Sequence, residues 1–178
     1  IDVREPAALP AAFAEAFAVL TAARPRPVHI NIPIDVLSLP ADGDTRLPAA
    51  AQPPQPDADA LARAVEALHR AERPMLLLGG GSARAQAEAV ALAELLGAPT
   101  ATTIAGKGVI ADAHPLSLGS MCTAAAVIEA YEQADAVLAV GTEFSETDYF
   151  YAPTLEPPAF GGTLIRIDID AEQLGKRR

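Results

Sequence analysis

The stretch PMLLLGGG at residues 74–81 decides the fold. Four consecutive large apolar residues, set between a proline and three glycines, predict a strand that is buried on both faces and ends in a tight turn. A strand of this kind is typical of a parallel sheet that helices cover on both sides. Residues 75–78 are therefore predicted to form a central strand, and residues 79–81 the turn into a helix.

The alternation of helix and strand continues toward the C-terminus. Hydrophobic periodicity predicts helices over 83–96 and 123–133, with Gly97 as the C-cap of the first, and strands over 100–104, 136–140 and 163–169. Nearly continuous apolar strands separated by helices define the fold class as α/β, a Rossmann-like parallel sheet with helices on both faces.

The segment before this sheet divides into three parts. Asp57 is a predicted N-cap for a helix that carries Leu61, Val65 and Leu68 on one stripe. Residues 40–56 contain five prolines and no hydrophobic periodicity, which is typical of an extended connector and marks a domain boundary. Residues 7–22 predict a helix and residues 28–32 a half-buried strand that Pro33 ends, so a helix and strand form the N-terminal unit.

Composition excludes several classes of protein. The chain has 178 residues, a net charge of −10, and no apolar run of membrane-spanning length, so we expect neither a nucleic-acid nor a membrane partner. Its single cysteine, Cys122, cannot form an internal disulfide, so a cytoplasmic location is the default. Because the sequence does not begin with methionine, we interpret it as a piece of a longer polypeptide.

The glycine turn 79–81 suits the pyrophosphate of a nucleotide, because it lies between a strand and a helix N-terminus. Arg84 occupies the place of the third fingerprint glycine, and no acidic residue follows about 20 positions on, which argues against an ordinary NAD dehydrogenase. The alternative interpretation, a tight turn that needs glycine for its backbone conformation, has equal weight.

Three further loops follow predicted strands. The sequence around Lys107 departs from the Walker pattern at Ala101 and Gly108, so a solvated lysine is the preferred interpretation. Glu143 lies where open α/β sheets bind ligands, and Asp168 and Asp170 are predicted to share one face at the end of the last strand. A ribose contact of Glu143, and a ribose or adenine contact of the two aspartates, are weighed equally against a helix cap or a loop carboxylate.

Other reactive residues have simpler interpretations. The three histidines have no metal-ligand spacing, and His114, next to Pro115, is expected to shape a turn. Cys122 is expected to be a small buried hydrophobe rather than a nucleophile. The aromatic residues 149–151 could form a lid on the core, a wall of a ligand site or a subunit contact, and a subunit contact is the preferred interpretation.

Taken in order, the motifs resemble the central domain of thiamine-diphosphate-dependent enzymes of the acetolactate synthase and pyruvate decarboxylase type. The resemblance rests on RPVHINIPIDV at 26–36, the proline-rich linker, PMLLLGGG at 74–81, TTIAGKGV at 102–109, HPLSLG at 114–119, ADAVLAVG at 134–141 and IRIDID at 165–170. It implies that residues 1–39 are the C-terminal tail of the pyrimidine-binding domain, 40–56 the linker, and 57–178 the central domain.

The resemblance also implies a parent enzyme that decarboxylates or ligates 2-keto acids with thiamine diphosphate and Mg²⁺. In this family the activating glutamate lies upstream of such a segment. The family's Gly-Asp-Gly metal motif, which is followed by paired asparagines, cannot be formed here, because Asp42-Gly43-Asp44 lacks the leading glycine and Asn31 is the chain's single asparagine. The isolated chain is therefore expected to be inactive, with the remaining domains as its partners, in a homo-oligomer that is a dimer or a tetramer.

Across the family the central domain holds FAD, holds ADP and coenzyme A, or is structural. Glu143 replaces the arginine of the flavin-binding members, and Ser120-Met121-Cys122-Thr123 replaces their glycine- and histidine-containing turn, which weakens the FAD reading. A stand-alone nucleotide-binding module and a purely structural spacer are the alternatives to an enzyme segment. The positions that the resemblance assigns to nucleotide contact are Gly79, Gly80, Gly81, Thr103, Gly106, Gly141, Thr142 and Asp168.

Overall fold

The computed structural model describes residues 1–41, 46, 49–149 and 159–175, and the chain divides into two compact units, Ile1–Gln55 and Pro56–Arg178. Each unit has its own buried core. Two sequence features lie outside the described residues: the incomplete metal motif Asp42-Gly43-Asp44, and Phe150 and Tyr151 of the aromatic residues 149–151. No helix in the described part of the chain combines the length and apolarity needed to cross a membrane.

The N-terminal unit contains the predicted helix but not the predicted strand. A 3₁₀ turn, η1 (Pro6–Ala8), leads into α1 (Leu9–Thr21), and a short α2 (Ile34–Leu37) follows Pro33. Residues 28–32 are extended with one bridge, in which Asn31 pairs with Asp2. The strand prediction was wrong because a strand needs a neighbouring strand that pairs with it along its length. Here the neighbouring segment is only residues 1–3, and it pairs with Asn31 in a single bridge.

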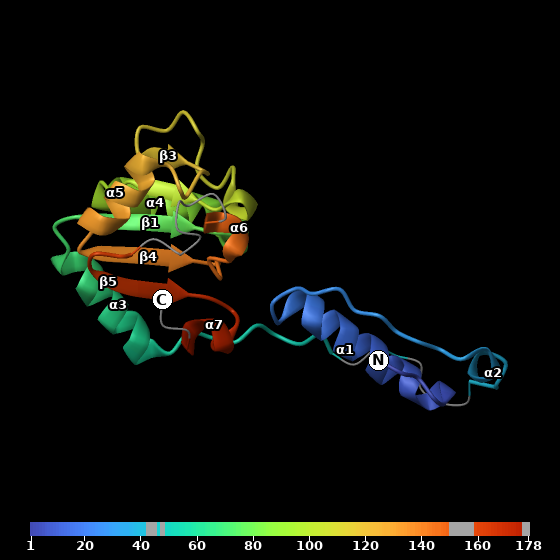
Figure 1. The fold of residues 1–178 in the computed structure, drawn as a ribbon. Coiled ribbons are helices and arrows are strands. Elements are labelled where there is room, and N and C mark those ends of the chain that lie inside the picture. Colours follow the sequence, from blue (N-terminus) through green and yellow to red (C-terminus); the bar gives the residue numbers. More distant parts are fainter. Residues whose placement is uncertain (42–45, 47–48, 150–158, 176–178) are drawn as a thin grey trace. The chain divides into compact units, whose positions relative to one another are not determined.

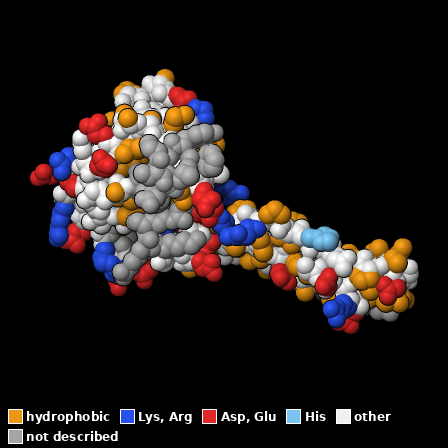
Figure 2. Space-filling view, in the orientation of Figure 1, with side chains coloured by type: hydrophobic (Ala, Val, Ile, Leu, Met, Phe, Trp, Pro, Cys, Tyr) orange, Lys and Arg blue, Asp and Glu red, His pale blue; other side chains and the backbone are white. Residues whose placement is uncertain are grey.

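The large apolar side chains of α1 are partly exposed. Ala12 and Ala16 pack with Val3 and Val36, whereas the larger side chains Phe13, Phe17 and Leu20 are 38, 50 and 45% exposed. Figure 2 shows hydrophobic side chains on the surface of this unit. A helix that is apolar on two sides normally lies in the interior of a larger structure.

The second unit is a five-stranded sheet in which all pairs are parallel (Figure 1). Its strands are β1 (Pro74–Leu78), β2 (Thr100–Thr102), β3 (Ser117–Gly119), β4 (Ala136–Val140) and β5 (Thr163–Ile167), in the spatial order β3-β2-β1-β4-β5. The chain crosses from β3 back to β4 beside β1, so strand order reverses between β1 and β4. This α/β fold class is the one that the sequence predicted.

Two helices cover opposite faces of the sheet. Successive residues of a strand point to opposite faces, so Met75 and Leu77 pack in the core with α5 (Ala125–Gln133), while Leu76 and Leu78 pack with α4 (Gln86–Leu96). All four strand side chains are at most 1% exposed. The helix α3 (Ala58–Arg70), in contrast, has no buried residue, so its predicted apolar stripe is only partly covered.

Helix boundaries follow their capping residues. The side chain of Asp57 accepts a hydrogen bond from Ala60 N at 2.6 Å, and Gly97 adopts a left-handed φ of 60°, so both predicted caps are confirmed. The helix predicted from residue 83 begins instead as a 3₁₀ helix, η2 (Gly80–Ala85). Five short elements were not predicted from the sequence: α2, β3, η3 (Ile104–Gly106), α6 (Glu146–Tyr149) and α7 (Ala171–Gly175).

Asp135, just before β4, fastens the loop that precedes β1. Its carboxylate accepts hydrogen bonds from the backbone N–H groups of Glu72, at 2.8 Å, and Arg73, at 3.0 Å. Desolvation alone would raise the pKa of Asp135, but these two donors together hold it below its ordinary value of 3.8. A lowered pKa stabilises the folded state above pH 3.8, and this contribution is lost as the pH falls through the folded-state pKa.

Asp135→Asn is therefore expected to lower the melting temperature at pH 7, because the amide accepts fewer hydrogen bonds, and to flatten the loss of stability below about pH 4. Circular dichroism melts between pH 7 and pH 2.5 measure both effects. Glu132→Gln, at an exposed position on α5, is the matched control and should leave the acid limb of the profile unchanged. Identical profiles for both variants would contradict this role for Asp135.

Candidate functional site

The loops that leave β1, β2 and β4 meet at the carboxyl edge of the sheet, where strand order reverses and open α/β sheets bind ligands. The backbones are in close contact, since a Cβ built on Gly81 would lie 2.7 Å from the Cα of Gly141. A Cβ on Gly79 would lie 2.5 Å from the Cβ of Thr142, and one on Gly106 would lie 2.1 Å from the carbonyl oxygen of Leu78.

The structure thus brings together seven of the eight predicted contact positions. A Cβ on Gly80 would lie 3.2 Å from Ala105 in η3, and Thr103 caps η3 by accepting a hydrogen bond from Gly106 N at 3.1 Å. Asp168 follows β5 instead, beyond the end of the strand, and its carboxylate accepts from Asp170 N at 2.9 Å. The expected shared strand face for Asp168 and Asp170 was wrong, because β5 ends at Ile167.

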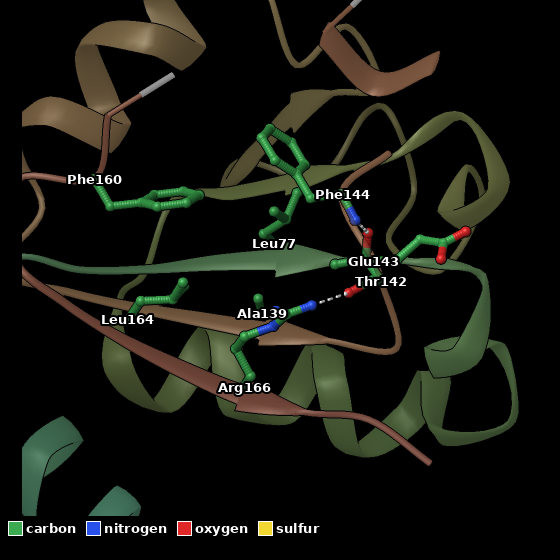
Figure 3. Close-up of a pocket in the computed structure, with 8 residues that line it drawn as sticks. All are labelled: Leu77, Ala139, Thr142, Glu143, Phe144, Phe160, Leu164 and Arg166. Atoms are coloured by element: carbon green, nitrogen blue, oxygen red, sulfur yellow. Dashed lines mark hydrogen bonds between the residues drawn. The ribbon is translucent and has the colours of Figure 1, made fainter. Parts of the chain in front are cut away.

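A hollow of about 270 Å³, open to solvent, lies beside these loops (Figure 3). Arg166 on β5 reaches across it and donates a hydrogen bond from Nη2 to the carbonyl oxygen of Thr142 at 3.2 Å. The hollow is lined by Leu77, Ala139, Thr142, Glu143, Phe144, Phe160, Leu164 and Arg166.

Phe144 turns the chain at the mouth of this hollow. It has a φ of 48°, which is rare for a bulky residue, and its N–H donates to Thr142 Oγ1 at 2.9 Å. Its ring packs against Tyr131, Tyr149 and Phe160, with centroid distances of 6.1, 5.9 and 6.0 Å. Tyr149, interpreted from the sequence as a subunit contact, thus packs at least partly against its own core.

Cys122 is buried, as predicted for a small hydrophobe. Its thiol is adjacent to the carbonyl oxygen of Thr102 at 3.4 Å, and the residue is 2% exposed. Burial raises the pKa of Cys122 to about 11, although the nearby hydroxyl of Tyr131 acts in the opposite direction. The thiol is therefore protonated at neutral pH, and a buried, protonated thiol is a poor nucleophile.

Asp148 is a residue that the sequence analysis missed. It accepts a hydrogen bond from Ser145 N at 3.1 Å, as the acidic residue of a capping box does at the start of α6. Burial raises the pKa of Asp148, the N–H groups of Ser145 and Ile104 act in the opposite direction, and the charge of Glu143 adds to the rise. The spacing of Ser145 and Asp148 is the signal that could have identified it.

Two residues have the simpler roles that were predicted. The ring of His114 accepts a hydrogen bond from Leu116 N at 3.2 Å, so it shapes the turn before β3. Lys107 is exposed and forms an ion pair with Asp112 at 2.6 Å. Among the residues that the structure describes, no group of three or more His, Cys, Asp and Glu side chains is placed to hold a metal ion.

The reversal of strand order, the glycine loops at its edge and the two covering helices define an α/β domain of the Rossmann-like class. Residues 61–178 match the family model described as "Thiamine pyrophosphate enzyme, central domain". The chain belongs to this family, as its sequence motifs indicated.

Named relatives agree with the family assignment. The chain is 44% identical over 167 residues, 93% of its length, to the Probable 2-ketoarginine decarboxylase AruI of Pseudomonas aeruginosa, of which it covers 29%. It is 31% identical over 190 residues to the Probable acetolactate synthase large subunit of Methanocaldococcus jannaschii, covering 98% of this chain and 31% of that protein. The chain thus spans about a third of the length of the curated relatives it matches.

Solved structures give the same result. A crystal structure described as a thiamin diphosphate-dependent enzyme from Mycobacterium smegmatis superposes with a TM-score of 0.81 and 29% identity, over 98% of this chain and 34% of that one. Benzoylformate decarboxylase from Polynucleobacter necessarius, at 22% identity and a TM-score of 0.77 over 99% of this chain and 34% of that one, supports the fold alone.

Proposed function

We propose that this chain is the middle segment of a thiamine-diphosphate-dependent enzyme that decarboxylates or ligates 2-keto acids. The observation that carries the proposal is the 44% identity to a protein named as a 2-ketoarginine decarboxylase, which extends over nearly the whole chain. The proposed partners are the pyrimidine-binding and diphosphate-binding domains of the same polypeptide, in a homo-oligomer of two or four copies. Within that enzyme, the second unit of the chain has a structural role.

The described residues do not fit thiamine diphosphate and Mg²⁺. No group of acidic and histidine side chains is placed to hold a metal among them, and the hollow beside β4 is small and mostly apolar. The proposal therefore assigns the cofactor and the reacting groups to other segments of the enzyme, and it predicts no activity for the isolated chain.

Carbon dioxide release tests this proposal. The complete polypeptide, supplied with thiamine diphosphate and Mg²⁺, is expected to decarboxylate at least one member of a panel that includes pyruvate and 2-ketoarginine. Residues 1–178 alone, the matched control, should release none. Activity of the isolated chain would contradict the assignment of the reacting groups, and a complete polypeptide that uses no 2-keto acid would contradict the reaction class.

The second candidate, a module that binds FAD or an ADP-containing ligand, would use the eight positions predicted from the sequence. Those positions lie mostly at one edge of the sheet, which is the geometry that the prediction requires. The names of the relatives mention no such ligand. The contacts that the loop backbones make with one another favour the first candidate.

A further inference from the structure

Four backbone N–H groups at the switch point, where strand order reverses between β1 and β4, are already bonded to the protein. Gly79 N donates to Val140 O at 2.8 Å, Gly81 N to Gly141 O at 3.0 Å, and Gly141 N to Ile167 O at 2.8 Å. Gly106 N likewise donates within its own loop, to Thr103 O at 3.0 Å. A loop that binds a pyrophosphate instead directs such N–H groups at the ligand, and each N–H provides a single donor.

The two central loops also leave no space between their backbones. A Cβ on Gly79 would lie 2.3 Å from Gly141 O, and a Cβ on Gly141 would lie 2.5 Å from the Cα of Gly81. These distances are shorter than any ordinary contact between carbon atoms or between carbon and oxygen. The glycines are therefore required at these positions by the contact between loops, with no ligand in between.

Two carboxylates close to the loop after β4 are unfavourable for a phosphate. Glu143 lines the hollow, and it lies near enough to Asp148 for its charge to act on that carboxyl group. The guanidinium of Arg166, on the same hollow, donates to the carbonyl of Thr142 within the protein (Figure 3). Two neighbouring carboxylates repel an anion at short range.

From these contacts we infer that the loops after β1 and β4 fill the crevice between them with their own backbones, so that this domain holds neither FAD nor an ADP-containing ligand. The glycines at 79, 81, 106 and 141 allow the loops after β1, β2 and β4 to pack on one another and on β1. This inference deepens the structural role proposed above and rests on it, but it is tested without any measurement of catalysis. The two can therefore fail separately.

The first test measures bound nucleotide directly. The chain and the complete polypeptide are purified without added nucleotide, denatured, and assayed by chromatography for FAD, ADP and coenzyme A. The expected content is below about one tenth of an equivalent of each, with no saturable heat in calorimetric titrations up to about 1 mM ligand. A stoichiometric nucleotide, or saturable binding in the micromolar range, would overturn the inference.

The second test asks what the glycines do when no ligand is present. Gly81→Ala places a methyl group 2.7 Å from the Cα of Gly141 and is expected to lower the melting temperature of the nucleotide-free chain by about 4 °C or more. Gly175→Ala, where the added Cβ has nothing within 4 Å, is the matched control and should leave it unchanged or raise it slightly.

Equal melting temperatures for Gly81→Ala and the unsubstituted chain would overturn the inference, because a glycine needed only for a ligand can be replaced without cost in its absence. If Gly81→Ala prevents folding, the nucleotide assays on the unsubstituted protein still decide. A chain that decarboxylates keto acids in its complete form and also contains FAD would refute this inference and leave the proposed reaction class intact.

Discussion

Tyr131→Ala is expected to lower the free energy of unfolding of the second unit by about 3–5 kcal/mol, the range for removing a buried aromatic side chain. Tyr131 lies on α5 and is 0% exposed. Its ring meets those of Phe160 and Phe144 edge to face, at centroid distances of 5.2 and 6.1 Å. Its removal leaves a cavity that is bounded by α5, the sheet and Phe144.

Tyr131→Phe is the matched control, because it removes only the hydroxyl group. Among the described residues this buried hydroxyl has no hydrogen-bond partner of normal geometry, and its polar neighbour is the thiol of Cys122. We expect stability to change by no more than about 1 kcal/mol, in either direction. Urea unfolding followed by circular dichroism measures both variants, and a loss below about 1 kcal/mol for Tyr131→Ala would contradict the central position of the ring.

The central strands were predictable because their sequences are apolar at every position. Residues 75–78 and 136–139 are buried on both faces, which a covered parallel sheet explains. The pattern of the three-residue strand at 117–119 is too short for any periodicity to appear. Its pairing with β2 depends on a register shift at Thr100 and Ala101, which is set by the tertiary structure.

Strand ends were less predictable than strand centres. The apolar residues Ile104 and Ile169 lie two positions beyond the ends of β2 and β5. The hydrophobic pattern therefore predicted both strands to be two residues longer than they are. The structure instead begins η3 at Ile104, because the hydroxyl of Thr103 caps it. Caps made by a single side chain can override a hydrophobic pattern at its edge.

For the candidate site, the sequence could predict where the glycines meet, but it could not predict which acceptors their N–H groups bond to. Position at the carboxyl edge follows from the order of strands and turns, which is a local property of the sequence. The partner of Gly81 N is the carbonyl of Gly141, 60 residues away, and this pairing depends on how β1 and β4 align. The same glycines are compatible with a ligand or with a neighbouring backbone, so the sequence left both interpretations open.

The exposed row on α1 leads to the last prediction, which rests on the proposed domain organisation. Phe13, Phe17 and Leu20 are spaced so that they share one side of the helix, and each is between 38 and 50% exposed. If residues 1–39 complete a pyrimidine-binding domain, the rest of that domain covers this row. Burying a phenylalanine side chain contributes about 1.5–3 kcal/mol, and placing an unpaired charge there costs more.

Phe17→Glu is therefore expected to leave the melting temperature of the isolated chain nearly unchanged, and to destabilise the complete polypeptide by about 3 kcal/mol or more. Ala11→Glu adds the same charge on the opposite side of α1, beside Glu15, and is the matched control for both proteins. Thermal melts of the four proteins, with soluble yield as a second readout, measure the difference. Equal effects of Phe17→Glu on the isolated chain and the complete polypeptide would show that no other segment covers this face. The added charge costs more in the complete polypeptide only if another segment buries Phe17 there.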